Sequence, residues 1–458
     1  MELKFKFLSF EIYLCADSKI SFMVRTSKLI DSFKSEINQA VNENNISKLQ
    51  DIITRFWEKI ETINYPIIEE LNGDSPNLSD YNLVTFLYRS DENLDNVFLL
   101  GEFNFVDPKD YIFDKIEHTD VFYKTFTLPK NTQAVYRILE NDPLDGIFAG
   151  AKYANRWSKF GNHPDKLNKN IQIIRNGFEE GRDMIVTWLK DPQDDSTSVL
   201  LDDEPRIIGK LNEYNHSSLI LKYSRKITVY TPPNYDSTLK YPYLIMLDGS
   251  LFLKYSRIHV IIDKFIENGQ IPAIVAIFVD PGLKDGQTKR YDEYPCNSDF
   301  AKSITEEILP WVKEKYSISE DPTEAIIAGS SYGGLAAFHY SFMYPNKIKN
   351  VLSLSGSFHV GKDENSDYPY EWLPQKVAFS DKRDINVFMR VGKLEGEYHW
   401  DSPDFPNQIV SHRHFTTILK MKGYKFTYDE YNGDHSLVAW IKPFKEGLLY
   451  FLAKCNKK

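Results

Sequence analysis

The chain has 458 residues, more than one ordinary domain needs, so two or three units are expected. Hydrophobic residues make up 42% and charged residues 26%, proportions that exclude a disordered, collagen-like or disulfide-scaffold protein. The net charge of −10, from 55 basic and 65 acidic residues, argues against a nucleic-acid-binding protein, which needs a basic surface. No stretch of the sequence reaches the roughly 18 apolar residues of a membrane span.

The three cysteines indicate the compartment and the kinds of site to expect. Cys15, Cys296 and Cys455 are far apart and show no CxxC spacing, which supports neither a disulfide framework nor a zinc site. A reducing compartment is the simpler interpretation. The N-terminus begins with lysines and apolar residues, as a signal peptide does, but Glu11 interrupts the run and no convincing cleavage site follows. We therefore expect a cytoplasmic protein.

The chain begins with a predicted helical segment and continues with a predicted β-sandwich. Apolar residues recur at three- and four-residue steps across residues 24–72, a pattern typical of amphipathic helices. Turn-forming residues at 72–80 mark a boundary, so we assign residues 1–75 to an N-terminal helical segment. Residues 80–146 contain short β-branched and aromatic runs between polar turns, which predict a small antiparallel β-sandwich domain.

The second half of the chain changes to an alternation of strands and helices. Residues 147–215 are polar and are expected to form a linker with a helix at 183–189. A hairpin is expected from strands at 219–223 and 226–230. Further strands are expected at residues 243–247, 273–279, 325–328, 351–354, 387–391 and 425–430. Strands that alternate with helices imply a mainly parallel sheet, so residues 216–458 are predicted to form one α/β domain.

The clearest chemical motif is Gly-x-Ser-x-Gly at residues 329–333, between an apolar strand and a helix rich in small residues. The serine of such a motif lies on a strained turn, and the glycines are needed because a Cβ there would collide with the neighbouring strand or helix. Ser331 is therefore the candidate nucleophile, at a helix N-terminus where free amides favour negative charge. The amide of Tyr332 is the candidate first oxyanion donor.

A nucleophilic serine needs a base and an acid, which in this context follow it in the order acid, then histidine. His435 is the candidate base because it lies in a loop between the last predicted strand and the last predicted helix. The acid is expected after the strand at 387–391. Glu395 is the first candidate there, Glu397 the second and Asp401 the third.

Other polar residues near these positions are given weaker roles. His412 and His414 fall in a helical pattern, so we expect them at the surface. Asp434 is adjacent to His435 and is therefore poorly placed to orient its ring. The second oxyanion donor is expected from the loop after the strand at 243–247, at an amide near Ser250.

Beyond the serine motif, several segments resemble a known family in their order and spacing. They are LDGSLF at 247–252, RYDE at 290–293 with Asn297, ILPWV at 308–312, AGSSYGGLAA at 328–337, GKLEGE at 392–397 and GDHSLVAW at 433–440. With them, the C-terminal part resembles the putative-esterase branch of the α/β-hydrolases, close to the enterochelin (enterobactin) esterases. Residues 82–146 also resemble that family's N-terminal domain. Where the family commonly has Gly-Gly-His, this chain has Gly433-Asp434-His435.

The resemblance implies a cytoplasmic hydrolase that opens the ester bonds of a catecholate siderophore and so releases its iron. It implies the same nucleophile, acid and base as the motifs above. It also matches Arg290, Asn297 and Trp440, which are our candidate substrate-binding residues.

The expected reaction is acyl transfer to water, in which His435 takes the proton of Ser331 and Glu395 holds the imidazole. No metal or organic cofactor is needed, and iron would belong to the small-molecule ester substrate. All candidate catalytic residues lie after residue 240. We therefore expect the C-terminal domain to contain the chemistry alone, and the sandwich to shape specificity for a bulky substrate.

Two alternatives remain. The same site would serve a carboxylesterase or acyltransferase for feruloyl, acetyl or thioester substrates, because fold and triad do not set the substrate. In a different class, the sandwich would make the chain a carbohydrate- or partner-binding protein with a secondary hydrolase domain. The intact order of serine, acid and histidine argues against an inactive hydrolase.

Overall fold

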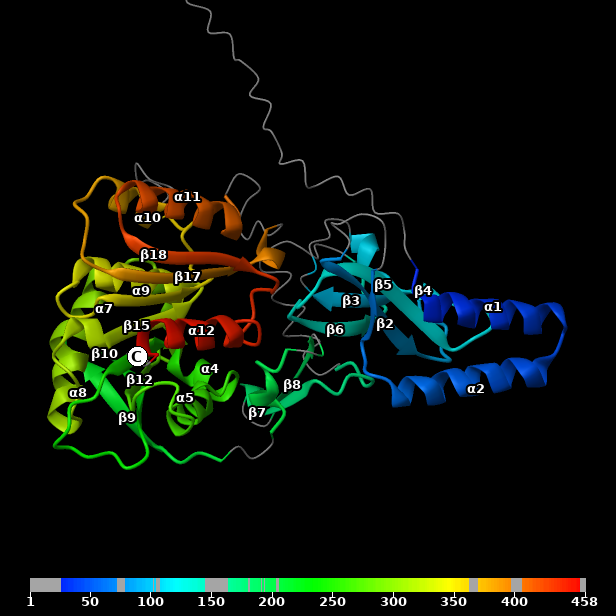
Figure 1. Cartoon of the computed structure of the whole chain (residues 1–458), viewed down its shortest axis with the longest axis horizontal. Coiled ribbons are helices and arrows are strands. Elements are labelled where there is room, and N and C mark those ends of the chain that lie inside the picture. The colour runs from blue at the N-terminus through cyan, green and yellow to red at the C-terminus, as the bar shows by residue number, and fades with distance from the viewer. Residues whose placement is uncertain are drawn as a thin grey trace, which may run out of the picture.

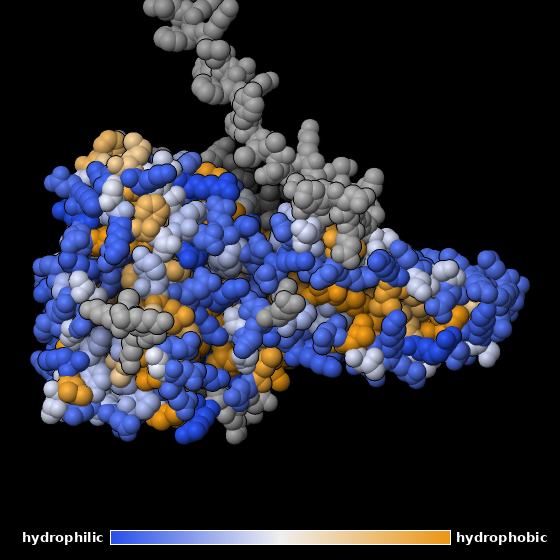
Figure 2. Space-filling view, viewed as in Figure 1, coloured by the Kyte–Doolittle hydropathy of each residue, from blue (hydrophilic) through white to orange (hydrophobic). Residues whose placement is uncertain are grey.

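The computed structural model describes residues 26–71, 79–101, 103, 108–144, 164–179, 182–190, 192, 194–202, 206–361, 370–396 and 406–453. A helix pair, a β-sandwich and a large sheet covered by helices follow one another in space and in sequence (Figure 1). Hydrophilic side chains cover most of the face seen in Figure 2, and hydrophobic ones show mainly along the sandwich and the helix pair. None of the described helices combines the length and apolar character that crossing a bilayer requires.

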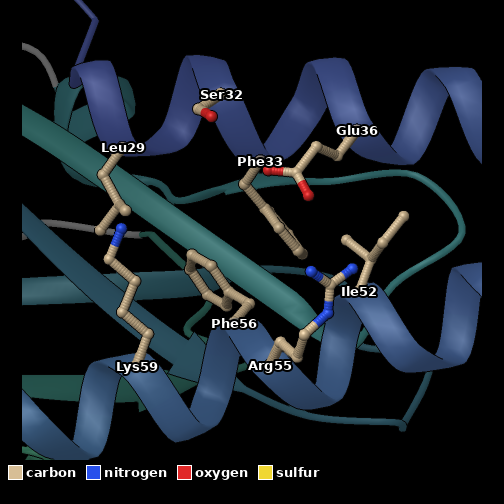
Figure 3. Close-up of a pocket in the computed structure, with 8 residues that line it drawn as sticks. All are labelled: Leu29, Ser32, Phe33, Glu36, Ile52, Arg55, Phe56 and Lys59. Atoms are coloured by element: carbon tan, nitrogen blue, oxygen red, sulfur yellow. The ribbon is translucent and has the colours of Figure 1, made fainter.

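The helix pair consists of α1 (Lys28–Asn42) and α2 (Ile46–Thr62). Phe33 of α1 stacks on Phe56 of α2 with the ring centroids 4.0 Å apart. Figure 3 shows the two rings between the helices, in a cleft that is also lined by Leu29, Ser32, Glu36, Ile52, Arg55 and Lys59. The buried sides of both helices continue into a cluster with the first sheet of the sandwich, which includes Tyr123. The pair is therefore packed on the sandwich rather than on the large sheet.

The sandwich consists, among the described residues, of two four-stranded antiparallel sheets in the orders β1-β2-β5-β4 and β3-β6-β8-β7. The strands are β1 (Ile67–Glu70), β2 (Tyr81–Arg89), β3 (Val97–Gly101), β4 (Asp114–Lys115), β5 (Val121–Pro129), β6 (Ala134–Glu140), β7 (Ile171–Glu179) and β8 (Arg182–Leu189). Aromatic rings from both sheets fill the space between them. Phe86 lies 5.9 Å from Phe126 and 4.8 Å from Tyr136, measured between ring centroids.

Two predictions about this region are wrong. Residues 183–189, expected to be a helix in a linker, belong to strand β8, which pairs with β6 and completes the second sheet. The β-branched and aromatic run from Ile185 to Trp188 prefers a strand, and its neighbouring polar residues obscured that signal. Residues 67–70, expected to be helical, form β1, because Pro66 cannot continue the preceding helix. The boundaries of the units remain a prediction, and residues 147–163 lie outside the described residues.

The large sheet has ten strands in the described chain, in the order β14-β13-β10-β12-β11-β15-β16-β17-β18, with β9 paired to β10. They are β9 (Lys210–Ser218), β10 (Tyr223–Thr231), β11 (Tyr243–Leu247), β12 (Val275–Val279), β13 (Leu283–Lys284), β14 (Gln287–Thr288), β15 (Ala325–Ser330), β16 (Asn350–Leu354), β17 (Asn386–Gly392) and β18 (Lys425–Tyr431). From β12 to β18 the pairs are parallel. The six strands predicted between residues 243 and 430 are thus confirmed. The hairpin is shifted, because residues 219–222 form its turn and not its first strand.

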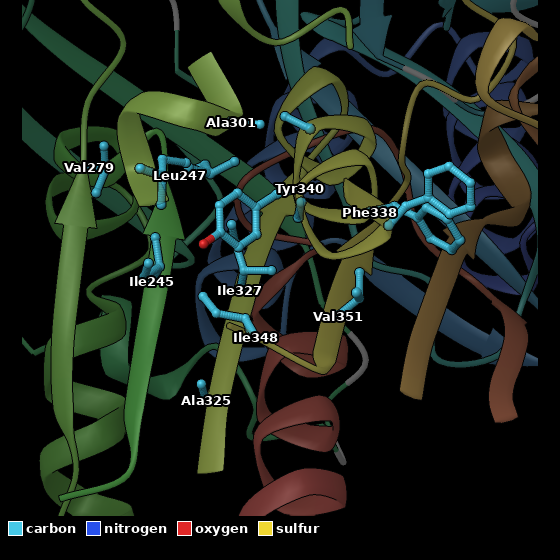
Figure 4. Close-up of a cluster of buried hydrophobic side chains, with 14 of the residues drawn as sticks. Ile245, Leu247, Val279, Ala301, Ala325, Ile327, Phe338, Tyr340, Ile348 and Val351 are labelled. Atoms are coloured by element: carbon cyan, nitrogen blue, oxygen red, sulfur yellow. The ribbon is translucent and has the colours of Figure 1, made fainter. Parts of the chain in front are cut away.

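Helices cover both faces of this sheet. One face carries α7 (Ser298–Ser303), η5 (Ile304–Ile308), α8 (Leu309–Lys315), α9 (Tyr332–Met343), α10 (Trp372–Ala378) and α11 (Gln408–Met421), and the other carries α4 (Gly249–Lys254), α5 (Ile258–Glu267) and α12 (Ile441–Leu452). Figure 4 shows the first core, where Leu247 and Ile327 of the sheet lie around Tyr340 of α9. The second core also includes Val135 and Trp188 of the sandwich. The sandwich and the large sheet therefore share a hydrophobic core.

A buried ion pair fixes the loop region that follows β12. Arg225 on β10 and Glu293 on the short helix α6 (Arg290–Glu293) are both fully buried and make two hydrogen bonds of 2.7 and 3.2 Å. The amide of Gly282 donates to the same carboxylate at 3.1 Å. Since all these groups are away from water, removal of one partner leaves a buried charge without compensation.

Glu293→Ala is expected to lower the free energy of unfolding by about 3–5 kcal/mol, because the Arg225 guanidinium would stay buried without its carboxylate. Urea denaturation followed by circular dichroism measures the change. Glu306→Ala is the matched control, since its partner Lys302 lies 3.8 Å away and both side chains are about half exposed. The control is expected to cost less than about 1 kcal/mol. Equal losses in the two variants would contradict a stabilising role for the buried pair.

Candidate active site

Ser331 lies on a tight turn between β15 and α9. Its backbone has φ 54° and ψ −125°, a strained combination for a residue with a side chain. A Cβ on Gly329 would lie 2.4 Å from the carbonyl carbon and oxygen of Gly333, so the strand and the helix approach at a distance that only glycine permits. The sequence motif therefore folds into the strained turn that it predicts, with the Ser331 side chain partly exposed.

The contacts of Ser331 fix its position at the edge of the sheet. Its amide donates to the carbonyl of Leu354, at the end of the adjacent strand β16, over 2.9 Å. Its Oγ lies 3.2 Å from Oγ of Ser357. The amide of Tyr332 belongs to the first residue of α9, where the first backbone amides have no partner within the helix. This end of a helix stabilises negative charge.

A carboxylate and an imidazole meet at the same edge of the sheet. Glu395 is the last residue of η7 (Lys393–Glu395), directly after β17, and His435 lies in the loop after β18. His435 Nδ1 lies 2.6 Å from Glu395 Oε2, with the carboxylate 1% and the imidazole 13% exposed. Because Nδ1 faces the carboxylate, proton exchange with a reacting group would use Nε2.

Two further side chains hold this pair: Ser355, which the sequence analysis missed, and Trp440, which it expected to bind substrate. Ser355 donates from Oγ to Glu395 Oε1 over 2.6 Å, and it accepts a 2.9 Å hydrogen bond from Nε1 of Trp440. The Gly392 amide also donates to Glu395 Oε1, over 2.7 Å. The ring of Trp440 stands edge-on to His435 with centroids 4.9 Å apart. The only sequence signal for Ser355 is its place directly after the strand next to the nucleophile strand.

Sheet register explains why these residues converge. Ser330 is paired with Leu354, and Leu354 with Arg390, so β15, β16 and β17 end side by side. The residues that follow the three strands include Ser331, Ser355 and Glu395 respectively. A serine on a strained turn, together with a carboxylate-oriented imidazole at the same edge, is an arrangement suited to nucleophilic acyl transfer.

The expected second oxyanion donor needs correction. The amide of Ser250 donates to Asp280 Oδ1 over 2.6 Å, and the Ser250 hydroxyl binds the other oxygen of that carboxylate. Burial raises the pKa of Asp280, while its hydrogen bonds with Ser250 lower it. An amide bound to a carboxylate is not available to an oxyanion, so the Ser250 amide does not fit the role expected for it.

The three candidate substrate-binding residues make internal contacts. Arg290 binds Asp248 through two hydrogen bonds of 2.8 Å, which compensate its charge. The side-chain oxygen of Asn297 accepts from the amides of Asp299 and Phe300 and caps α7. Trp440 is 5% exposed and supports the acid–histidine pair, as described above. These contacts give each side chain a structural role.

The remaining predictions concern histidines and alternative acids. His412 is fully buried on α11, contrary to expectation, and burial lowers its pKa to about 4. The helical pattern was correct, but it did not indicate which face of the helix the residue occupies. His414 is exposed and lies 2.9 Å from Glu371, as expected for a surface residue. Glu397 and Asp401 lie outside the described residues.

Asp434 is buried beside the histidine. Its Oδ2 accepts a 2.8 Å hydrogen bond from the amide of Val135 in the sandwich, and its Oδ1 accepts a 2.5 Å bond from Ser436. Burial, together with the negative charge of Glu395, outweighs the lowering by the two donors and by His435 and raises the pKa of this carboxyl to about 7. Asp434 therefore does not orient the imidazole, but it is bonded to the other domain.

Asp434→Asn is expected to change how stability depends on pH. The folded pKa of about 7 lies above the ordinary value of 3.8, so the folded chain holds the proton more tightly than the unfolded chain. This contribution is fully present below about pH 4 and is lost as the pH rises to about 7. The asparagine variant has no titrating carboxyl here and does not lose this stability, so its melting temperature relative to wild type should increase between pH 5 and pH 8. A constant difference across this range would contradict the raised pKa.

Comparisons with known sequences identify a family for the chain. A family profile described as "Putative esterase" matches residues 218–451, more than half of the chain. The iron(III) enterobactin esterase of Dickeya dadantii is 31% identical over 260 residues, which cover 54% of this chain and 56% of that protein. The protein of the same name from Escherichia coli K12 is 30% identical over 138 residues, which cover 30% of this chain and 34% of that one. The matched region thus spans about half or less of the length of these curated relatives.

Solved structures share the fold over most of the chain. The enterobactin esterase of Shigella flexneri, in a crystal structure in the presence of enterobactin, has a TM-score of 0.64 and 22% identity and covers 87% of this chain and 97% of its own. Ferric enterobactin esterase from Salmonella typhimurium has a TM-score of 0.68 and 18% identity, with 87% and 98% covered. The fold is that of an α/β-hydrolase domain preceded by a β-sandwich. By the extent of the profile match, the chain belongs to the esterase family of α/β-hydrolases.

Proposed function

We propose that the protein is a serine esterase that hydrolyses the ester bonds of a catecholate siderophore of the enterobactin type. The observation that carries the chemistry is the 2.6 Å hydrogen bond between Glu395 and His435, at the sheet edge where Ser331 occupies its strained turn. The substrate class is supported by the curated relatives, whose names specify iron(III) enterobactin.

In the proposed reaction Ser331 is the nucleophile and His435 the general base. The imidazole takes the hydroxyl proton as Oγ attacks the ester carbonyl, and then returns it to the leaving alcohol. Glu395 holds the ring in the tautomer with a proton on Nδ1 and stabilises its protonated form. Water repeats the attack on the acyl-enzyme and releases the acid.

The proposed oxyanion hole is made of backbone amides. Tyr332 supplies the first, at the N-terminus of α9. For the second we propose Gly249, the first residue of α4, since the Ser250 amide is bound to Asp280. Two amides at helix N-termini favour the developing negative charge without any metal ion or organic cofactor. Iron would enter only as part of the substrate.

An aromatic acyl group is supported by a ring next to the site. Tyr291 is 67% exposed and lies edge-on to Tyr332, with centroids 5.7 Å apart. An exposed ring beside the residue that follows the nucleophile offers a flat partner for a catechol, with a gain of about 0.5–1.5 kcal/mol per ring pair. We place the reaction in the cytoplasm, on the cysteine pattern that indicated a reducing compartment.

The substrate is tested directly by product analysis. The purified chain is incubated with ferric enterobactin, with iron-free enterobactin and with an aryl acetate, and the products are identified by mass spectrometry. We expect linear trimer, dimer and monomer of dihydroxybenzoylserine, formed at a higher kcat/KM than the aryl acetate product. Hydrolysis of the aryl acetate alone would favour a plain carboxylesterase. Absence of any hydrolysis would favour a binding protein instead.

Ser331→Ala and His435→Ala are each expected to lower kcat for every ester by at least about 10³-fold, because each removes a group that reacts. The double variant should be little worse than either single one, since the residues act as a unit. Ser330→Ala, at the neighbouring buried position, is the matched control and should keep its turnover. Labelling of Ser331 by a fluorophosphonate, followed by peptide mass spectrometry, reports the nucleophile independently. Near wild-type turnover in either single variant would rule out this site.

Glu395→Gln is expected to lower kcat by about 10³-fold or more, because an amide at this position no longer stabilises the protonated imidazole. Glu397→Gln is the comparison and should cost little. Steady-state kinetics of both variants on the same ester decide between the two acids. A larger loss in Glu397→Gln would transfer the role of the acid to that residue.

A further inference from the structure

The loop that carries His435 is paired with the sandwich through its backbone. Gly433 forms a parallel β-bridge with Gln133, which lies in the turn between β5 and β6. The Gln133 amide donates to the carbonyl of Asn432 over 2.9 Å, and the Asp434 amide donates to the carbonyl of Gln133 over 3.2 Å. The Asn432 side chain adds a 2.7 Å bond to the carbonyl of Lys130. The histidine loop thus extends an edge of the other domain.

Asp434 continues this pairing with its side chain. The residue is 3% exposed, and its Oδ2 accepts from the amide of Val135 over 2.8 Å. This bond joins residues 299 positions apart in the chain, and it ends one residue before the imidazole. A buried amide without an acceptor carries a substantial desolvation cost, so the Val135 amide has a strong preference for the conformation of the loop that provides one.

The loop that carries Glu395 is fixed to the same domain. Leu394 is 2% exposed and belongs to the hydrophobic cluster between the two sheets of the sandwich. Its amide donates to the carbonyl of Gly433 over 3.1 Å, which connects the acid loop to the histidine loop. The sandwich therefore contacts the residue before Glu395 and the residue before His435.

A third set of contacts holds the helix that follows the histidine loop. Lys442 of α12 lies 3.0 Å from Asp194, and Lys445 donates to the carbonyl of Ser196 over 2.7 Å. The side chain of Gln133 binds Ser196 Oγ over 2.8 Å. The segment after β8 thus links the end of the chain to the same turn that pairs with Gly433.

We propose that the sandwich is part of the catalytic apparatus, because it holds the histidine loop in its reactive position through Asp434. Asp434 is a positioning residue, since it acts on His435 through the loop and not on the substrate. The expectation that the C-terminal domain contains the chemistry alone is replaced by a site whose acid and histidine loops depend on the N-terminal domain. This inference rests on the proposed function, because positioning matters only if His435 acts as a base.

Three variants of the full chain test the proposal. Asp434→Ala removes the acceptor of the Val135 amide, whereas Asp434→Asn keeps an oxygen there. Asp263→Asn is the matched control, because Asp263 is likewise buried, at 2% exposed, and accepts backbone amides, those of Ile208 and Gly209, away from the site. Circular dichroism first establishes that each variant is folded.

The expected kinetic result on an aryl acetate is a loss of kcat with little change in KM. Asp434→Ala should lower kcat by about 10- to 100-fold, because a base displaced by about 1 Å transfers a proton poorly. Asp434→Asn should restore kcat to within about threefold of wild type, and Asp263→Asn should stay within about twofold. Wild-type kcat in Asp434→Ala would overturn the proposal. So would equal losses in the alanine and asparagine variants, because the charge and not the bond to Val135 would then matter.

Hydrogen–deuterium exchange separates this proposal from the proposed function. In the Ser331→Ala background, which does not turn over, Asp434→Ala should speed exchange of the amides at 432–436 and of Val135, whereas Asp263→Asn should not. If the chain hydrolyses no ester, the proposed function is wrong, but the exchange rates still show whether Asp434 holds the histidine loop against the sandwich. If the exchange rates are unchanged, Asp434 does not hold the loop, even in an active esterase. If Asp434→Ala is unfolded, Asn432→Ala, which removes only the bond to Lys130, carries the same test with a smaller expected effect.

Discussion

The hydrogen bond between Glu395 and His435 joins two loops that leave the neighbouring strands β17 and β18, and it fixes the position of the imidazole. Its carboxylate is almost completely buried, so each oxygen must find donors within the protein. The Gly392 amide and the Ser355 hydroxyl bind Oε1, and the imidazole binds Oε2. With three donors in place, the carboxylate has one orientation that satisfies it, and the ring of His435 takes its orientation from that carboxylate.

The surrounding packing serves the same bond from two directions. On one side, Ser355 bonds to both Glu395 and Trp440, and the ring of Trp440 also packs edge-on against the imidazole. On the other side, the sandwich contacts both loops through Leu394 and through the amide of Val135. The nucleophile needs less external support, because the conformation of Ser331 is set within its own turn by the close approach of Gly329 and Gly333.

A feature can be predicted from the sequence when nearby residues determine it, and it is missed when the deciding partner lies far along the chain. The six central strands and the turn at Ser331 are set by short runs of residues, and both were found from the sequence. The predictions were wrong where a residue far away in the sequence determines the contact or the burial. The Ser250 amide is taken by Asp280, 30 residues away, and nothing in the local sequence indicates that bond. The helical period around His412 gave the correct element, but burial depends on which neighbours cover that face.

Strand β8 shows the same limit for secondary structure. Its polar surroundings favoured a linker, yet pairing with β6 places the run at Ile185–Trp188 inside a sheet. The supports of the acid–histidine pair are the extreme case, since Val135 and Asp434 are separated by almost two thirds of the chain. Pattern analysis chose His435 and Glu395 as candidates from the order of strands and loops, and the structure brings the two side chains together. It gave no sign of Ser355 or of the role of Asp434.

The separation of Val135 and Asp434 along the chain has a consequence for synthesis. A ribosome completes the sandwich, with its β5–β6 turn, long before residues 432–436 have been made, and domains generally fold as units in the order of synthesis. During that interval the amides of Gln133 and Val135 are without the acceptors that they have in the finished protein. The nascent sandwich therefore carries two backbone amides that gain their acceptors only when the loop at residues 432–436 has been made. The support that the sandwich gives to the acid–histidine pair is then formed late, after the sandwich itself has folded.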